Sequence, residues 1–169
     1  MKKYELTDDT ITVGGRILHR IKALKSFSDV EEGDLGGYVE KEDNLDHSGE
    51  AWVSGNARGY GNAWVYGDAR VYGDAWVYGD ARVSGDARVS GDARVSGEND
   101  YAAAKGFGRE YRTTTFFRLQ DGGIGVRCGC FCGTLEEFRE KVKETHKESK
   151  MGKEYLMLAD LMEYKFKNA

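Results

Sequence analysis

A repeat of six residues runs from His47 to Arg94 and restricts the chain to very few folds. When each unit starts at its apolar position, eight consecutive units follow one another, such as VSGNAR from Val53 and VYGDAR from Val65. Position one is valine in all but the first and third units, position three is always glycine, and position five is always alanine. An α-helix would need apolar residues three and four apart, and a half-buried strand would alternate every second residue. Neither element fits a strict period of six.

The residue types at each position predict a corner in every unit. Glycine at position three suits a turn whose backbone angles a Cβ would oppose. The Asn, Asp or Glu that follows also suits a turn, because Asn and Asp side chains can bond to nearby backbone groups. One corner every six residues gives a triangular coil of 18 residues, with positions one and five pointing inward. The repeat spans a little under three coils, and the looser stretch 35–46 is expected to add part of another.

The unit V-x-G-D-A-x resembles the hexapeptide repeat of left-handed parallel β-helix proteins. That family contains acyltransferases, γ-class carbonic anhydrases and non-catalytic scaffolds, and its members are commonly trimers with parallel prisms. The resemblance implies the fold. It leaves the function open, because the repeats describe the core and the turns while activity is added on the outside. A prism of so few coils also needs covers at its ends.

The segments on both sides of the repeat predict these covers. On the N-terminal side, 11–13 and 16–24 flank the turn signal Gly14-Gly15 and are expected to form a hairpin. On the C-terminal side, 111–119 and 124–131 flank the turn 120–123 as a second hairpin.

Two helices are predicted after the second hairpin. Thr134 and Glu137 form a capping box, and the helix that they begin carries an apolar face of Leu135, Phe138 and Val142. A last helix is expected over 153–167, with Leu158, Leu161 and Met162 inward. The expected fold is therefore mainly β: an N-terminal β-hairpin cap in 1–34, a left-handed parallel β-helix in 35–100 and a small C-terminal ββαα module in 101–169.

The outward positions of the repeat are rich in aromatic and arginine side chains. Position six carries Trp52, Arg58, Trp64, Arg70, Trp76, Arg82, Arg88 and Arg94, and position two carries Tyr60, Tyr66, Tyr72 and Tyr78. Because residues 18 apart stack on one face, each Trp is expected to have a guanidinium against its ring, and Tyr60 is expected to stack on Tyr78.

Two interpretations of these ladders stay open. In the first they only stabilise the coils, with the position-four aspartates offsetting the arginines. In the second, which we favour, they form a subunit interface, since aromatic residues and Arg are enriched at interface centres. Clefts between the prisms of a trimer would then suit a planar anionic ligand such as a nucleotide. The residues expected there are Trp64, Trp76, Tyr66, Tyr72, Arg70 and Arg82.

The residues that could support catalysis or bind a metal are few. The histidines are His19, His47 and His146, and only His47 lies at the edge of the repeat, at an inward position. This argues against a three-histidine zinc site and a histidine-based acyltransferase. The sequence places Cys128, Cys130 and Cys132 on one strand, facing the same way, without the usual C-x2-C spacing, so buried thiols are expected. We predict no catalytic residue, metal or cofactor.

Composition and the flanking segments bear on partners and origin. A net charge of −4 and a pI near 5.5 argue against a dedicated nucleic-acid binder. No secretory signal and no apolar run near the ~20 residues of a membrane span occur, which predicts a cytoplasmic protein. The segments GGRILHRIKALKSFSDVEEGDLGGYVE, GCFCGTLEEFREKVKETH and KEYLMLADLMEYKF resemble a group of proteins carried by phages and prophages. This resemblance implies a mobile-element origin in a bacterial host.

The sequence thus predicts a non-enzymatic, trimeric binding protein. It would sequester a small anionic ligand such as a nucleotide signal, or mask a host protein, and so inhibit host defence. Two alternatives remain open: a spacer in virion structure or assembly, and an acyltransferase with an atypical site.

Overall fold

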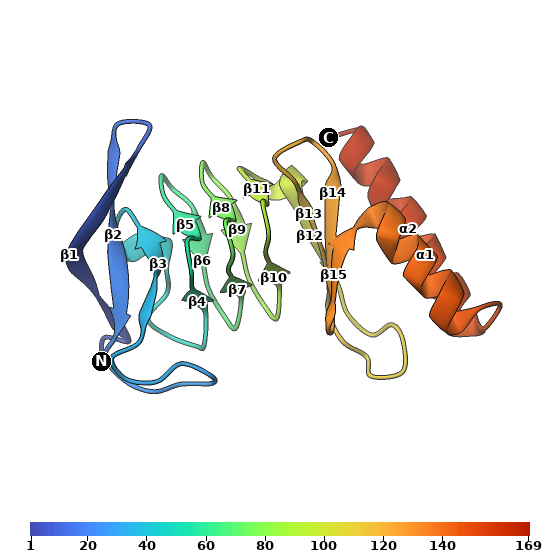
Figure 1. The fold of residues 1–169 in the computed structure, drawn as a ribbon, viewed down its shortest axis with the longest axis horizontal. Helices are drawn as coiled ribbons and strands as arrows, with labels where there is room; N and C mark the ends of the chain where they lie inside the picture. The colour runs from blue at the N-terminus through green and yellow to red at the C-terminus, as the bar shows by residue number, and fades with distance from the viewer.

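The computed structural model describes residues 1–169, and its centre is a parallel β-solenoid of about three coils (Figure 1). Each strand of a coil comprises position six of one repeat unit and position one of the next. The strands are β4 (Trp52–Val53), β5 (Arg58–Gly59), β6 (Trp64–Val65), β7 (Arg70–Val71), β8 (Trp76–Val77), β9 (Arg82–Val83), β10 (Arg88–Val89) and β11 (Arg94–Val95). Residues 18 apart pair in parallel, as Arg70 does with Trp52 and Arg88, which confirms the predicted coil length.

The solenoid has three faces, which we name by their strands. The β4-β7-β10 face and the β6-β9 face consist of coil strands alone. The β5-β8-β11 face is extended at one end by β3 (Leu35–Val39), which pairs in parallel with β5.

The interior of the coils is narrow and filled by small side chains, as predicted. Every alanine at position five and every valine at position one from Val53 to Val95 is at most 1% exposed. The glycines at position three all have φ between 62° and 72°, a region that a Cβ disfavours. At the corners, Asn56 and Asn62 each donate a side-chain hydrogen bond to an aspartate one coil further on, with N–O distances of 3.2 and 3.0 Å.

The N-terminal hairpin caps one end of the solenoid, as predicted. It consists of β1 (Tyr4–Val13) and β2 (Arg16–Ala23), and β2 pairs antiparallel with β3. After the short 3₁₀ helix η1 (Glu42–Asn44), Leu45 forms a parallel bridge with Val65. The stretch 35–46 therefore adds part of a further coil.

Lys3 ties the start of β1 to the first coil. Its Nζ is buried and donates to the backbone oxygen of Ala51 at 2.7 Å. Burial lowers the pKa of Lys3 from 10.5 to about 8. The charged form of this side chain therefore destabilises the folded state.

We expect the protein to become more stable as the pH rises from about 8 to about 9.5, by at most about 2 kcal/mol. In this range the unfolded chain retains the Lys3 proton and the folded chain releases it, so deprotonation favours the folded state. Burial raises the pKa of Tyr4, which works in the opposite direction only above about pH 10. Urea denaturation at several pH values measures the slope of the free energy of unfolding against pH. Lys3→Met should abolish it, and an unchanged slope in this variant would contradict the assignment.

A four-stranded antiparallel sheet covers the other end of the solenoid. Its order is β12 (Tyr101–Ala104), β13 (Thr114–Arg118), β14 (Ile124–Cys128), β15 (Phe131–Thr134), after the 3₁₀ helix η2 (Glu98–Asp100). The predicted second hairpin is present as β13 and β14, and two more strands join it. Phe117 packs into the solenoid core, and Thr115 Oγ1 accepts a hydrogen bond from the backbone of Arg88 at 3.0 Å. The last coil is thereby sealed.

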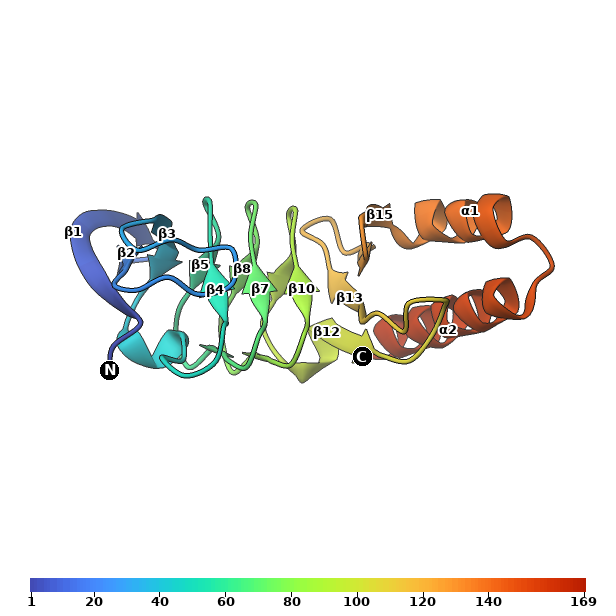
Figure 2. The same cartoon turned by 90° about the horizontal axis from the view of Figure 1, so that it is seen from below.

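The helices α1 (Leu135–His146) and α2 (Lys150–Lys167) lie beyond this sheet, away from the coils (Figure 2). The predicted capping box is confirmed, because Thr134 Oγ1 accepts from Glu137 N at 3.2 Å and Glu137 accepts from Thr134 N at 2.8 Å. Neither helix combines the length and apolar composition that crossing a bilayer requires.

The apolar faces of the helices were predicted with one error. The face of α1 is buried as expected, and so are Leu158 and Met162 of α2. Leu161 is 58% exposed, so its predicted inward orientation is wrong. The buried side of α2 runs instead through Tyr155, Leu158, Ala159, Met162 and Phe166, at helical spacing, and Leu161 falls off this stripe.

Candidate functional site

The β4-β7-β10 face forms the floor of a groove. Along one side runs the loop 24–34 between β2 and β3, which lies back over the coils (Figure 2). On the other side is the segment 105–113 between β12 and β13. Two cavities, of about 610 and 670 Å³, lie on this face and share Ser28, Arg70 and Arg88. We call them the first and second cavity, and together the groove.

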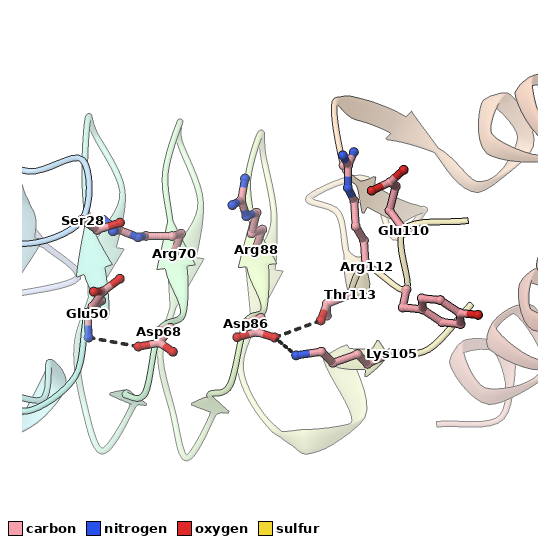
Figure 3. Close-up of a pocket in the computed structure, with 12 residues that line it drawn as sticks. Ser28, Glu50, Asp68, Arg70, Asp86, Arg88, Lys105, Glu110, Arg112 and Thr113 are labelled. Carbon is pink, nitrogen blue, oxygen red and sulfur yellow. Dashed lines mark hydrogen bonds and ion pairs between the residues drawn. The ribbon is translucent and has the colours of Figure 1, made fainter. Parts of the chain in front are cut away.

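Basic side chains line the groove. Arg70 and Arg88 follow one another on neighbouring coils, and Arg112 continues the row from the segment 105–113 (Figure 3). Lys105 also lines the first cavity and Arg127 lines the second. A parallel row of carboxylates, Glu50, Asp68 and Asp86, stands at the adjoining corner of the coils (Figure 3).

Only two of these cations are paired with a carboxylate. Arg70 Nη2 lies 2.8 Å from Asp29 Oδ1, and Lys105 is paired with Asp86. The hydrogen bond from Lys105 lowers the pKa of Asp86. No carboxylate lies within ion-pair distance of the three remaining groups, which are the guanidiniums of Arg88, Arg112 and Arg127.

Arg127 and Tyr72 form a cation–π contact at the wall of the second cavity. The guanidinium carbon of Arg127 lies 5.4 Å from the centre of the Tyr72 ring. The Tyr72 hydroxyl and Arg127 Nε are both buried without a hydrogen-bond partner. Such groups usually find a partner, because leaving them unpaired is costly. Both side chains line the second cavity, so a ligand oxygen that enters between them would pair with both groups.

The structure confirms that residues 18 apart stack in ladders, and it confirms some of the predicted side-chain contacts within them. Parallel pairing places Trp64 under Arg82, and Trp76 between Arg58 and Arg94. The guanidinium carbons of Arg58 and Arg94 lie 4.8 and 4.4 Å from the Trp76 ring. Tyr60 stacks on Tyr78 with ring centres 5.3 Å apart, as expected.

For the other two tryptophans the expected guanidinium contact is wrong. Trp52 is only 4% exposed, because Phe27 of the loop 24–34 and Tyr4 pack on it, with ring centres 5.4 and 6.3 Å away. Trp52 points out of the coil beside Arg70, as predicted, but its predicted accessibility is wrong because the loop covers it. Trp64 is 37% exposed and stacks on Tyr66 at 4.1 Å.

Within one chain, the residues expected in clefts between prisms do not form one site. Trp64, Tyr66 and Arg82 lie on the β6-β9 face, and Trp76 lies on the β5-β8-β11 face. Arg70 and Tyr72 belong to the groove, together with Arg88. Whether copies of the chain bring these faces together stays a prediction.

The histidines are separated from one another. His19 Nδ1 lies 3.0 Å from the backbone oxygen of Thr7, and His47 stacks on Tyr4 at the half-buried edge of the first coil. His146 contacts Tyr155 at the end of α1. No three His, Cys, Asp or Glu side chains are arranged to hold a metal ion.

The three cysteines do not share a strand, which corrects the prediction. Cys128 ends β14, Cys130 lies in the turn and Cys132 lies in β15, and the last two are exposed. Gly129 explains the difference, because its φ of 57° allows the chain to reverse there. Cys132 Sγ lies 3.5 Å from Ser90 Oγ beside the groove.

Sequence reasoning missed Lys105, Arg112, Arg127 and Asp29 as groove residues. All four lie outside the repeat, where no period indicates which way they point. Arg127 follows the buried Val126 in a strand, so its outward direction could have been predicted. Its meeting with Tyr72 depends on how the sheet docks on the coils.

Comparison with known proteins supports the solenoid alone. Residues 63–79, 75–89 and 81–97 match the YdcK β-solenoid repeat family. No curated protein matches the chain. By its coils and by this match, the chain is a repeat β-helix protein whose segment 63–97 is similar to the YdcK β-solenoid repeat.

Proposed function

We propose that this protein is a non-enzymatic binding protein for a small anionic ligand, which it holds in the groove. The observation that carries the proposal is the set of three guanidiniums, Arg88, Arg112 and Arg127, that line the groove without a carboxylate partner. Guanidinium groups bind phosphate and carboxylate through paired hydrogen bonds. An anionic ligand would complete interactions that the chain itself leaves open.

This proposal places the ligand within one chain instead of between prisms. Self-association, as a trimer, remains part of it and is supported by the exposed Trp64–Tyr66 stack on the β6-β9 face. The likeness of the repeat to hexapeptide proteins, and of the flanks to phage-encoded proteins, supports a role in the cytoplasm of a bacterial host. There the protein would sequester a nucleotide signal or mask a host protein, and so inhibit host defence.

Arg88→Gln is expected to weaken the binding of pyrophosphate by about 10- to 100-fold, because a hydrogen-bonded charge contact is lost. Titration calorimetry at low salt measures the affinity. Arg82→Gln is the matched control, since Arg82 has the same repeat position and is also exposed and unpaired, but lies on the β6-β9 face. Its affinity should stay within about two-fold of the wild type.

A second variant should raise the affinity for pyrophosphate, where Arg88→Gln lowers it. Asp29→Asn removes the carboxylate that pairs with Arg70, so the freed guanidinium should tighten pyrophosphate binding about three- to ten-fold. Glu148→Gln removes the same charge far from the groove and should change little. Loss of binding in Arg82→Gln instead of Arg88→Gln would contradict the groove and favour the cleft between prisms.

A further inference from the structure

The two cavities of the groove have a common middle and different ends. Ser28, Arg70 and Arg88 line both. Beyond them, the first cavity reaches Arg112, and the second reaches Arg127 and Tyr72. The groove therefore has two separate compartments that one ligand could span.

Each compartment has its own unpaired guanidinium. Arg112 supplies it in the first cavity and Arg127 in the second, while Arg88 serves both. Arg70 in the middle is already neutralised by Asp29. Glu110 also lines the first cavity, beside Arg112, but forms no ion pair with it (Figure 3). An unpaired guanidinium therefore remains toward each end, and the complementary ligand carries an anionic group at each end.

Two buried polar atoms identify the anionic group of the second cavity more closely. The Tyr72 hydroxyl and Arg127 Nε can both donate a hydrogen bond, and neither has an acceptor. A phosphate group presents several strong acceptor oxygens on one centre and can accept from both. A carboxylate has two oxygens and can also accept from both, but a phosphate keeps a further oxygen for the other donors of the Arg127 guanidinium.

The carboxylates of the first cavity indicate what lies between the phosphates. Glu50 and Asp68 form no ion pair there, and Asp68 Oδ1 accepts only from the backbone of Glu50, at 3.2 Å. Their negative charge disfavours a phosphate group directly beside them. They can accept hydrogen bonds from hydroxyl groups, as carboxylates commonly do.

We propose that the ligand of the groove is a polyhydroxylated molecule, such as a sugar or nucleoside, with two separate phosphate groups. One phosphate binds between Arg88 and Arg112, and the other binds Arg127 and the Tyr72 hydroxyl. The hydroxyls of the skeleton face Glu50 and Asp68. This assignment rests on the proposed function and specifies the chemistry of its ligand.

The test compares two probes on the full chain by titration calorimetry: fructose 1,6-bisphosphate and fructose 6-phosphate. The bisphosphate is expected to bind at least about 10-fold more tightly, because the second phosphate binds as part of a molecule already held. Pyrophosphate, which has two joined phosphates and no hydroxyls, should show no such advantage.

Variants separate the two compartments. Arg112→Gln and Arg127→Gln should each bring the bisphosphate to within about three-fold of the monophosphate, which can still use the other end. Arg109→Gln is the control, since Arg109 is exposed in the same segment but lines neither cavity. Should Arg127→Gln fail to fold, Tyr72→Phe keeps the ring, removes only the hydroxyl and should reduce the advantage of the bisphosphate.

Equal affinities for the two probes in the wild type would overturn the assignment, and so would an advantage that survives both arginine variants. These outcomes differ from failure of the proposed function. If Arg88→Gln still abolishes monophosphate binding, the groove binds anions and only the two-phosphate ligand is wrong. If neither probe nor pyrophosphate binds, both proposals fail.

Discussion

Alanine in place of Trp52 is expected to lower the free energy of unfolding by about 3–5 kcal/mol. Trp52 is 4% exposed and is enclosed by Phe27, Tyr4 and Gly36. Truncation would leave a cavity beneath the loop 24–34, in which Val30 is the one apolar side chain that is itself buried. The loop forms one side of the groove, so its release should also weaken ligand binding.

Trp64→Ala is the matched variant, since Trp64 has the same repeat position and residue type. It is 37% exposed and contacts chiefly Tyr66, so its loss should cost no more than about 2 kcal/mol. Urea denaturation of both variants gives the comparison. Equal costs would mean that the loop 24–34 does not pack on Trp52 in solution.

Gly79→Ala is expected to destabilise the protein by about 1–3 kcal/mol more than Gly85→Ala. The two glycines share a repeat position and nearly the same φ, 62° and 63°, so the cost of placing a Cβ in left-handed backbone is common to both. They differ in what a Cβ would meet. At Gly79 it would lie 2.5 Å from the backbone oxygen of Ser96, whereas nothing lies within 4 Å at Gly85.

The difference between Gly79→Ala and Gly85→Ala measures the free energy that depends on close stacking of one coil on the next. Chemical denaturation of the two variants, with calorimetric melting as a second measure, gives the difference in stability. Similar losses would show that the coils can separate at this corner at little cost, which the hydrogen bond from Asp80 N to Ser96 O argues against.

The solenoid could be predicted from the sequence because each repeat position has one physical task, performed in every unit. Valine and alanine fill a narrow interior, and glycine forms each corner. Because the same pattern occurs in every unit, an error in predicting one strand does not change the predicted fold. The capping box at Thr134 was likewise predictable, since both of its hydrogen bonds are local in sequence.

The outer surface could not be predicted, because segments outside the repeat decide it. Trp52 and Trp64 have equivalent positions in the coil, yet only the first is covered by the loop 24–34. Nothing in the repeat specifies that loop. The groove depends in the same way on Arg112 and Arg127, which meet the coils only after the C-terminal sheet has docked.

The three faces give the number of repeat units a geometric meaning. Every unit turns the chain by one third of a circle, so the angle between the two terminal caps depends on the unit count divided by three. Adding or removing 18 residues would change the length of the prism and keep that angle. A single unit gained or lost would leave the fold intact but rotate the C-terminal sheet to a neighbouring face, separating Arg127 from Tyr72. Such an indel would erase the groove without touching any of its residues, so relatives of this chain that keep the groove should differ in length by whole coils.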